Sequence, residues 1–424
     1  MPKNKDILVI GAGLAGIEAS LLAANAGRKV YLIEKKPYFG GASIKSEEIA
    51  PNMECATCML APKQSELLED KNIELMTLSE IKEISGDSGD FTATIIKRAR
   101  YVSLANCIGC GACFEPCPVS VNNEFEEDLS KRKAIYIACP GALPNAPAID
   151  MDYCVRAKGD DCNKCKEACM FEAIIYDDKD EEIEIKVGAI IVATGYLLGD
   201  MNQFTTYGYG KFKNVFNAFE FERLRASNGP TGGEIQTRDG KKAKSIALIH
   251  CVGRDKKGYC SQVCCMYLTK FAHYALDKLP GVQVYQLYKE LSIPGKGNQK
   301  FYHEVNEKGV RAMRAKEIEV AENGNGAGLK IIYRNEKVEK ESIDVDMVVL
   351  APYIEPYPGT DTLAKLLGVE LGSFGFFKTA EFDSISTTRP GIYVAGCAQG
   401  PKFMEDVIIQ AQAATAHALF STED

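Results

Sequence analysis

Cysteine is the residue whose number and spacing in this sequence best suit chemistry, with 16 among 424 residues. Eight form two four-cysteine runs between residues 101 and 178, and four more lie close together from Cys251 to Cys265. Reduced thiols inside a cell seldom form structural disulfides, so this many cysteines favour metal ligation over cross-linking. Their spacing then indicates which of them share a centre.

Both runs resemble the bacterial ferredoxin pattern, in which three cysteines bind one 4Fe–4S cluster and the fourth crosses to the other. The first run ends in Cys-Pro, and the second has a first gap that is five residues wider. The predicted ligands are Cys107, Cys110, Cys113 and Cys169 for one cluster, and Cys117, Cys154, Cys162 and Cys165 for the other. We therefore expect an inserted ferredoxin domain. A zinc ribbon is disfavoured, because zinc sites do not need two interlocked runs.

The cysteines from Cys251 to Cys265 are spaced irregularly and leave three interpretations open. They could hold a third 4Fe–4S cluster, pack into the core at the start of a helix, or bind zinc. Four cysteines in a loop rich in Arg, Asp and Lys favour the cluster, which would bring the iron content to about 12 atoms per chain. The predicted ligands are Cys251, Cys260, Cys264 and Cys265.

Cys55 and Cys58 form a separate Cys-x-x-Cys pair, and Cys58 stands four residues before a Pro-Lys pair, as in glutathione-reductase-like enzymes. Three interpretations stay open for this pair: a redox-active site facing a flavin, cluster ligation, or a structural role. Cys139 has no partner at a suitable spacing, so we expect it to be buried as an apolar residue.

A nucleotide-binding unit opens the chain and would position this redox chemistry. The apolar strand Ile7–Ile10 leads into Gly11-Ala12-Gly13-x-x-Gly16 and a helical stretch, and the next strand ends on Glu34. This order is the βαβ fingerprint of dinucleotide binding, with an acidic residue 23 positions after the first glycine. The glycines would let the backbone approach a pyrophosphate, while Glu34 would accept a hydrogen bond from a ribose hydroxyl.

Three later segments favour FAD over NAD. Residues 34–42, 189–196 and 390–397 resemble, in order, the glycine pair, the Ala-Thr-Gly strand and the C-terminal flavin motif of flavoproteins with two dinucleotide-binding domains. Lys402 is the candidate for a catalytic charge near the isoalloxazine. The alternative is that Lys402 is a solvated lysine on the surface. The predicted FAD-binding residues are Gly11, Ala12, Gly13, Gly16, Glu34, Lys35, Gly40, Gly41, Ala42, Thr194, Gly195, Gly396, Pro401 and Lys402.

The expected architecture is an α/β, thioredoxin-reductase-like flavoprotein. We assign residues 1–100, 179–242 and 346–424 to the FAD domain and its connector, 101–178 to the ferredoxin insertion, and 243–345 to a second Rossmann-like domain. The second domain starts with the strand Lys244–His250 but has cysteines where a second Gly-x-Gly-x-x-Gly would stand. We therefore predict that the isolated chain is a poor NADH or NADPH oxidase.

Across about residues 5 to 415 the sequence resembles the A subunit of heterodisulfide reductase. The resemblance is specific in Tyr259–Cys265, Arg132–Ile137 and Gly396–Lys402, and we expect this sequence to lack the extra terminal domains of longer archaeal members. It implies an FAD and iron–sulfur electron-transfer subunit, flavin-based electron bifurcation, and a hetero-oligomer. The implied partners are the B and C subunits of that enzyme, or a hydrogenase or dehydrogenase module, and ferredoxin. The alternatives are a thiol/disulfide reductase using Cys55 and Cys58, and a subunit that only conducts electrons.

Composition and charge agree with a cytoplasmic location. The net charge of −8 opposes a nucleic-acid role, because phosphate binding needs a concentrated basic surface. The charged residues Met1–Asp6 lead straight into a strand rather than a signal peptide, and no apolar run reaches the roughly 20 residues of a membrane span.

Overall fold

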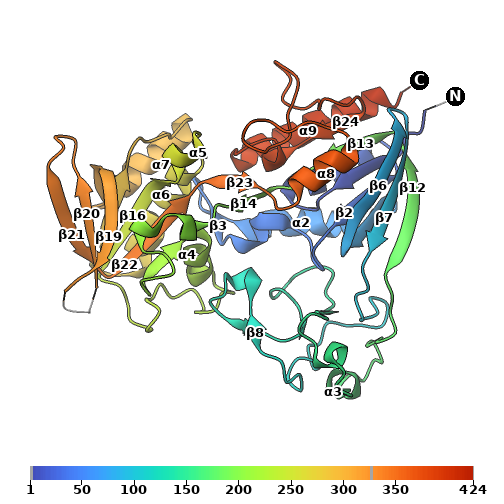
Figure 1. The fold of residues 1–424 in the computed structure, drawn as a ribbon, viewed down its shortest axis with the longest axis horizontal. Helices are drawn as coiled ribbons and strands as arrows, with labels where there is room; N and C mark the ends of the chain where they lie inside the picture. The colour runs from blue at the N-terminus through green and yellow to red at the C-terminus, as the bar shows by residue number, and fades with distance from the viewer. Residues whose placement is uncertain (1–2, 325–327, 424) are drawn as a thin grey trace.

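A computed structural model describes residues 3–324 and 328–423. The chain forms three lobes (Figure 1): a first domain that contains both termini, a second domain beside it, and an irregular lobe below, made by residues 101–178. Within the described ranges, no helix is both long enough and apolar enough to cross a membrane.

The first domain is built on a five-stranded parallel sheet in the order β24-β13-β1-β2-β5. The central strand β1 is buried along its whole length, as expected for an apolar strand covered on both faces. Its strands are β1 (Ile7–Ile10), β2 (Val30–Glu34), β5 (Ile73–Thr77), β13 (Ala189–Val192) and β24 (Ile392–Val394). The predicted βαβ unit and the strand of the Ala-Thr-Gly motif are therefore present in one sheet.

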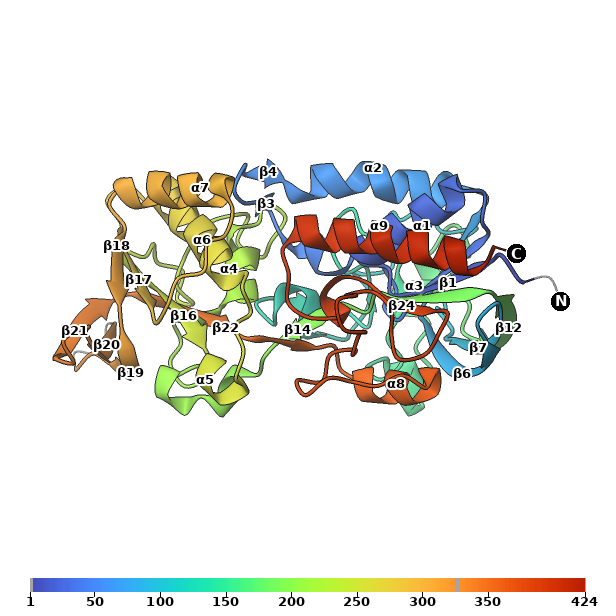
Figure 2. The same ribbon diagram turned by 90° about the horizontal axis from the view of Figure 1, so that it is seen from above.

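Each face of this sheet has its own apolar core. Helices α1 (Leu14–Asn25), α2 (Ala56–Glu69) and α9 (Met404–Ser421) cover one face (Figure 2). The other face packs on an antiparallel sheet and on helix α8 (Thr360–Leu367). That sheet has the order β12-β7-β6, formed by β6 (Ser79–Asp87), β7 (Asp90–Lys97) and β12 (Glu181–Val187).

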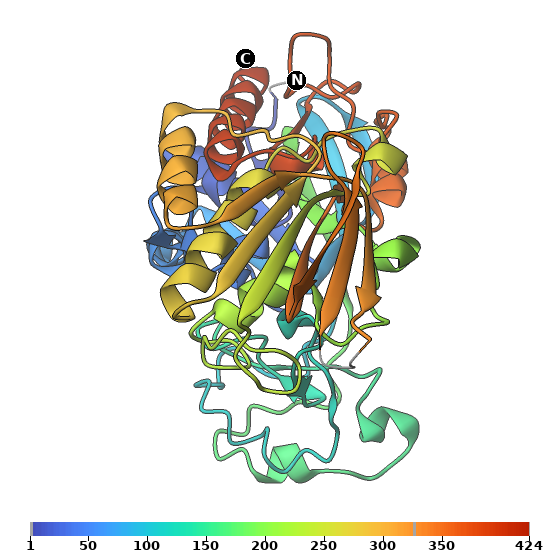
Figure 3. The same cartoon turned by 90° about the vertical axis from the view of Figure 1, so that its left-hand side faces the viewer.

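The second domain repeats this plan with a parallel sheet in the order β15-β22-β16-β17-β18 (Figure 3). These strands are β15 (Val215–Asn217), β16 (Ser245–Val252), β17 (Gln283–Tyr288), β18 (Arg311–Arg314) and β22 (Met347–Pro352). Strands β15 and β22 lie outside the range 243–345 that was predicted for this domain. They belong to its sheet because β22, which is fully buried, pairs with β15 on one side and with β16 on the other.

Helices and a small sheet cover the two faces of this second sheet. The helices are α4 (Ala218–Arg225), α6 (Cys264–Lys278) and α7 (Lys296–Glu307), and the short α5 (Arg254–Lys257) follows β16. The opposite face carries an antiparallel sheet of β19 (Lys316–Glu322), β20 (Leu329–Arg334) and β21 (Lys340–Val345).

Two strands cross between the domains side by side. The outgoing strand β14 (Tyr196–Leu198) pairs antiparallel with the returning strand β23 (Ile354–Pro356). A second two-stranded pair, β3 (Glu48–Ile49) and β4 (Glu54–Cys55), precedes α2.

The lobe of residues 101–178 has little regular structure and a small core of its own, to which six of its cysteines contribute. Its elements are β8 (Val121–Asn122), β9 (Lys131–Arg132), β10 (Ile135–Tyr136), β11 (Ala148–Ile149) and α3 (Lys164–Glu167). The lobe leaves and rejoins the first domain through two neighbouring strands, because Lys97 of β7 faces Glu181 of β12. It is therefore inserted between two adjacent strands.

Candidate functional site

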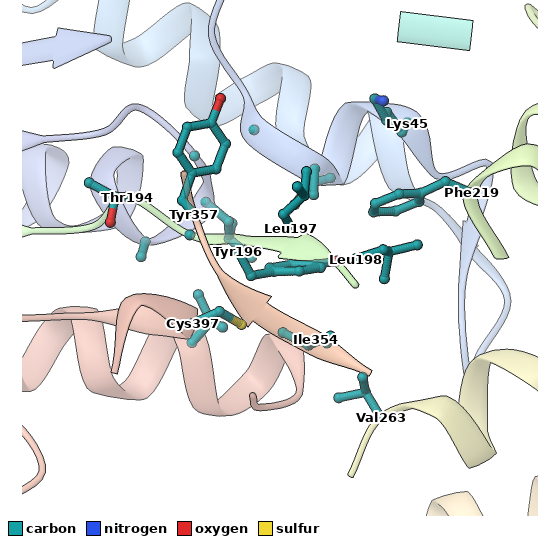
Figure 4. Close-up of a pocket in the computed structure, with 18 of the residues that line it drawn as sticks. Lys45, Thr194, Tyr196, Leu197, Leu198, Phe219, Val263, Ile354, Tyr357 and Cys397 are labelled. Carbon is teal, nitrogen blue, oxygen red and sulfur yellow. The ribbon is translucent and has the colours of Figure 1, made fainter. Parts of the chain in front are cut away.

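A cavity of about 1070 Å³ runs from the glycine turn of the first domain to the start of α6 in the second. Figure 4 shows its wall near the crossing strands, with Tyr196, Phe219 and Cys397 around it. Among the predicted FAD-binding residues, those that line it are Gly11, Gly13, Glu34, Lys35, Gly41, Ala42, Thr194, Gly195 and Lys402. The predicted residues that do not line it are Ala12, Gly16, Gly40, Gly396 and Pro401.

The glycines of the turn serve different purposes. Gly11 has a φ of +102°, and a Cβ there would lie 2.5 Å from the Ala193 carbonyl oxygen. A Cβ on Gly16 would lie 1.8 Å from the carbonyl oxygen of Gly11, so both glycines are needed for close packing of the chain itself. A Cβ on Gly13 would meet only the Cα of Gly41, at 3.7 Å. The space over Gly13 therefore belongs to the cavity, at the N-terminus of α1, where an anion is favoured.

Glu34 is fixed at the end of β2 by two backbone donors. The N–H of Ala12 donates to its Oε2 at 3.0 Å, and the N–H of Lys36 donates to its Oε1 at 2.9 Å. Burial raises the pKa of the Glu34 carboxyl, and these two hydrogen bonds oppose the rise. The carboxyl group thus has a defined position in the cavity wall.

Lys402 also lies in the wall, and its ammonium group is fully used by the chain. It donates to the carbonyl oxygens of Gly396 at 2.9 Å and Gly400 at 2.8 Å, and to Oε1 of Gln399 at 3.1 Å. These are all the donors that an ammonium has. Burial lowers the pKa of Lys402. The side chain therefore orders the 396–402 loop and brings a positive charge to the cavity.

The second domain supplies a wall that sequence patterns did not predict. Tyr267, Lys270 and Phe271 of α6 line the cavity at helical spacing, one turn after the start of the helix. Lys270 forms a buried ion pair with Glu222 at 2.7 Å, and Glu222 also lines the cavity. The i, i+3 and i+4 spacing of these residues can be read from the sequence and places them on one side of the helix. It does not show whether that side faces the domain's own core or another domain.

Several cysteines of the lobe lie close to one another, and the neighbours of Cys113 come from both predicted sets. Burial raises the pKa of Cys113 to about 12, and Cys165, Cys107 and Cys169 lie near enough to contribute. Burial also raises the pKa of Cys165, whose neighbouring thiols belong to the second predicted set, Cys117, Cys154 and Cys162. Cys110 is exposed.

The third cysteine group lies where β16 ends and α6 begins. A hydrogen bond that the Cys264 thiol donates to Cys265, together with burial, raises the pKa of Cys264 strongly, and Cys251 and Cys260 are near enough to add to this rise. The buried imidazole of His250 lies beside Cys265, and neither of its ring nitrogens has a hydrogen-bond partner among the described residues. Four thiols and an unpartnered buried imidazole form a donor set suited to an iron–sulfur centre.

A single metal ion needs a tighter arrangement. In the part of the chain that the structure describes, no three or more His, Cys, Asp or Glu side chains are placed to hold one.

The remaining cysteines lie elsewhere. Cys55 and Cys58 are exposed at the start of α2, where the N–H of Cys58 donates to Sγ of Cys55 at 3.2 Å, and neither lines the cavity. Cys139 is buried in the first domain's apolar core, and burial raises its pKa to about 11.

Comparison with known proteins agrees with this arrangement. Residues 6–52 match the family model of FAD dependent oxidoreductases. The chain is 40% identical over 422 residues to the A subunit of the H(2):CoB-CoM heterodisulfide,ferredoxin reductase of Methanothermobacter marburgensis, covering 97% of this chain and 63% of that protein. It is also 40% identical over 420 residues to the iron-sulfur A subunit of the CoB–CoM heterodisulfide reductase of Methanocaldococcus jannaschii, with the same coverage.

Solved structures show the same fold at low sequence identity. The thioredoxin reductase of T. acidophilum matches with a TM-score of 0.53 and 13% identity, over 98% of this chain and 97% of that one. This similarity is one of fold, and it agrees with the predicted thioredoxin-reductase-like architecture.

The matches to methanogen proteins extend over almost the whole of this chain, which spans less than two thirds of the length of those relatives. The aligned region contains all three cysteine groups. The chain is therefore similar, over almost its whole length, to the A subunits of heterodisulfide reductases.

Proposed function

We propose that this chain is an electron-transfer component of a larger oxidoreductase, with FAD in the interdomain cavity and three 4Fe–4S clusters on its cysteine groups. One observation carries the proposal: helix α6 contributes to two sites at once. Cys264 and Cys265 belong to the third cysteine group, whereas Val263, Met266 and Tyr267, which flank them, line the cavity. A flavin and a cluster would therefore share one wall.

The residues at the glycine turn suit the adenosine diphosphate part of FAD. The open space over Gly13 and the N-terminus of α1 would hold the pyrophosphate. Glu34, fixed by two backbone donors, would accept a hydrogen bond from a ribose hydroxyl. Thr194 and Gly195, together with the loop that Lys402 orders, would enclose the flavin end.

The cysteines would carry the clusters in the combinations that their spacing predicts. The lobe of residues 101–178 would then be the inserted ferredoxin domain. The proximity of Cys165 to Cys117, Cys154 and Cys162, and of Cys113 to Cys107 and Cys169 as well as to Cys165, supports two neighbouring clusters in this lobe.

Bound FAD exchanges two electrons and each cluster exchanges one, so the assembly can convert electron pairs into single electrons. The family relationship extends the proposal to flavin-based electron bifurcation. The residues of this chain would hold the cofactors at fixed positions and keep water out of the cavity.

Partner proteins would exchange electrons through the lobe. Apolar side chains near Cys107 and Cys169 in the sequence are exposed. Among them are Leu104, Ile108 and Met170, whose exposed fractions are 53%, 57% and 89%. Exposed apolar residues grouped around a redox centre favour docking of another protein. By relation to the family, these partners would be further components of heterodisulfide reductase, or a hydrogenase or dehydrogenase module, and ferredoxin.

Two alternatives remain distinguishable. A thiol/disulfide reductase would use Cys55 and Cys58, which are exposed and outside the cavity wall, so the placement of the pair does not favour it. A subunit that only conducts electrons would carry the same cofactors but show no bifurcation. An assay with NADH, ferredoxin and dithiol substrates separates these functions, and rapid flavin bleaching by NADH alone would contradict the absence of a nicotinamide site.

The direct test is cofactor analysis of the purified chain under anaerobic conditions. Denaturation should release one FAD per chain, and iron analysis should find about 12 iron atoms, four for each cluster. Release of FMN, or a protein that binds no flavin, would contradict the flavin assignment. About eight iron atoms would remove the third cluster only.

A further inference from the structure

The lobe of residues 101–178 reaches the cavity through one turn, residues 123–129. Of the lobe's residues, all of which the structure describes, Glu127 alone lines the cavity. Its carboxylate forms an ion pair with Lys45, which lines the same cavity from the first domain. The exposed fractions of these two side chains are 22% and 12%, so the pair borders the cavity without being sealed from it.

Lys45 is held where the lobe and both domains meet. It ends the short helical turn Gly41–Lys45, which begins at the glycine beside the predicted pyrophosphate site. Its ammonium also donates to the backbone oxygen of Glu124 at 3.3 Å, and lies 5.5 Å and 5.4 Å from the ring centroids of Phe125 and Phe219. Figure 4 shows Lys45 beside Phe219 at this end of the cavity. A cation is attracted to aromatic faces at such distances, so its position is well defined.

The turn that carries Glu127 has an unusual backbone. Glu127 has a φ of +51° and Asp128 a φ of +62°, in the left-handed region that residues other than glycine seldom adopt. Such conformations persist where the surrounding structure fixes them. Here the N–H of Asp128 donates to the carbonyl oxygen of Asn123 at 3.0 Å, and the ring of Phe125 is buried in the first domain's apolar core. The Glu127 carboxylate is therefore brought to the cavity by a fixed turn.

The charges of this pair reach other residues of the cavity wall. Burial raises the pKa of Tyr196, and Glu127 is among the groups near enough to add to the rise. Burial also lowers the pKa of Lys36, which Lys45 lowers further and Glu127 opposes. Tyr196 follows the Ala-Thr-Gly motif, and both Tyr196 and Lys36 line the cavity. The two charges would therefore act in opposite directions on a group bound at this end.

We propose that the Lys45–Glu127 pair sets the redox potential of the bound flavin, so that the lobe supplies part of the flavin's electrostatic environment. The inference rests on the proposed function, because it requires FAD in the cavity. Reduction adds electron density to the isoalloxazine ring, which a nearby cation favours and a nearby carboxylate opposes. Neither side chain has to touch the ring, because charges act over a distance. Together the two charges largely cancel.

Single substitutions in the pair should shift the flavin midpoint potential in opposite directions. Glu127→Gln leaves the Lys45 ammonium without its counter-charge, so the potential should become more positive. Lys45→Met leaves the carboxylate without its counter-charge, so the potential should become more negative. At an effective dielectric constant of about 20, we expect the ratio of reduced to oxidised flavin to change about tenfold, or about 30 mV for two electrons. The double variant should return close to the wild-type potential.

Asp128→Asn is the matched control. Asp128 is the next residue of the same turn and also has a positive φ, but it is exposed and does not line the cavity. The substitution removes one carboxylate, as Glu127→Gln does, and asparagine tolerates this backbone conformation. Its flavin potential should equal that of the wild type. FAD retained per chain, iron content and melting temperature show that each variant is folded and carries its cofactors.

The signs of the shifts decide the matter. Opposite shifts in the single variants, with a double variant close to wild type, would support the inference, because structural damage has no reason to reverse its sign. Shifts of the same sign, or a Glu127→Gln potential equal to that of Asp128→Asn, would overturn it. Should Lys45→Met fail to fold, the comparison of Glu127→Gln with Asp128→Asn decides alone. A wild-type chain that binds no FAD would overturn the proposed function together with the inference, so the two failures are distinguishable.

Discussion

Arg223 of the second domain and Glu126 of the 101–178 lobe form a buried, two-pronged ion pair. The guanidinium donates to both carboxylate oxygens of Glu126, at 2.9 and 3.0 Å, and also to the backbone oxygen of Lys45 in the first domain, at 3.0 Å. The two side chains are only 1% and 7% exposed. One arginine therefore joins all three lobes and sets their relative positions.

Loss of this pair should destabilise the protein strongly. Replacing Arg223 by Leu leaves the Glu126 carboxylate buried without its partner, so we expect the free energy of unfolding to fall by about 3–5 kcal/mol. The measurement is urea unfolding followed by circular dichroism. Arg334→Leu is the control, because its pair with Glu317 is exposed and should contribute less than about 1 kcal/mol. Equal effects of the two substitutions would refute the role of the buried pair.

Gly13→Ala should abolish FAD retention without harming the fold. The added Cβ would meet only the Cα of Gly41, at 3.7 Å, so the protein itself tolerates it, whereas the pyrophosphate would lose its place. FAD content after gel filtration and the melting temperature of the flavin-free protein are the readouts. Gly297→Ala is a close control, because its Cβ would also meet its nearest neighbour, in Pro51, at 3.7 Å. Stoichiometric FAD in Gly13→Ala would show that the turn has another purpose.

Acid should weaken FAD binding through Glu34. Burial raises the pKa of this carboxyl, so it becomes protonated at a higher pH than an exposed glutamate, whose pKa is near 4.5. The protonated carboxyl is a poorer acceptor for a ribose hydroxyl, so FAD affinity should be full at high pH and fall as the pH drops through the raised pKa. Flavin fluorescence, which increases on release, follows this titration. Glu34→Gln should bind FAD more weakly and with little pH dependence, and a wild-type profile in that variant would contradict the assignment.

Cys264→Ala should remove one cluster and leave two. We expect a loss of about four iron atoms per chain, with a matching change in the electron paramagnetic resonance spectrum of the reduced protein. Cys139→Ala is the control, because this cysteine is also buried but lies outside the three groups. Unchanged iron in Cys264→Ala would mean that these cysteines only pack into the core.

Charge placed on the exposed apolar surface of the lobe should slow electron exchange with partners. Ile108→Glu and Met170→Glu introduce carboxylates at positions that flank Cys107 and Cys169, where a docking protein would have to desolvate them. Reduction rates with ferredoxin, measured by stopped flow, should fall about tenfold while iron and FAD contents stay constant. Phe382→Glu, which changes a fully exposed ring on the first domain, should leave the rate unchanged. Equal rates in all three variants would place the docking surface elsewhere.

Local patterns predicted the parts of the fold in which sequence neighbours act together. The strand, glycine turn and helix from Ile7 onward appeared as predicted, because their hydrogen bonds and their close packing involve residues near one another in the chain. The cysteine spacing predicted that the lobe's thiols lie near one another, but the neighbours of Cys113 come from both predicted sets. Membership of β22 in the second sheet could not be predicted, since it depends on pairing with strands from distant segments.

The same limit applies to the site. Lys402 lines the cavity, but its three acceptors depend on how the 396–402 loop turns, which its motif does not reveal. The cavity-facing side of α6 was missed because it becomes a wall only when two domains meet. Tyr267 and Lys270 looked like ordinary core positions of an amphipathic helix.

Attachment of the lobe to adjacent strands makes it removable in principle. Because Lys97 and Glu181 face each other across β7 and β12, cutting out residues 98–180 and joining these ends with a two-residue turn would close an ordinary β-hairpin. The sheets on either side would keep their pairing, but the first domain's apolar core would lose Phe125 and Cys139, and Arg223 would need a neutral replacement. The flavoprotein frame can thus gain or lose a cysteine-rich module at one hairpin, which offers a modular route for rewiring such proteins.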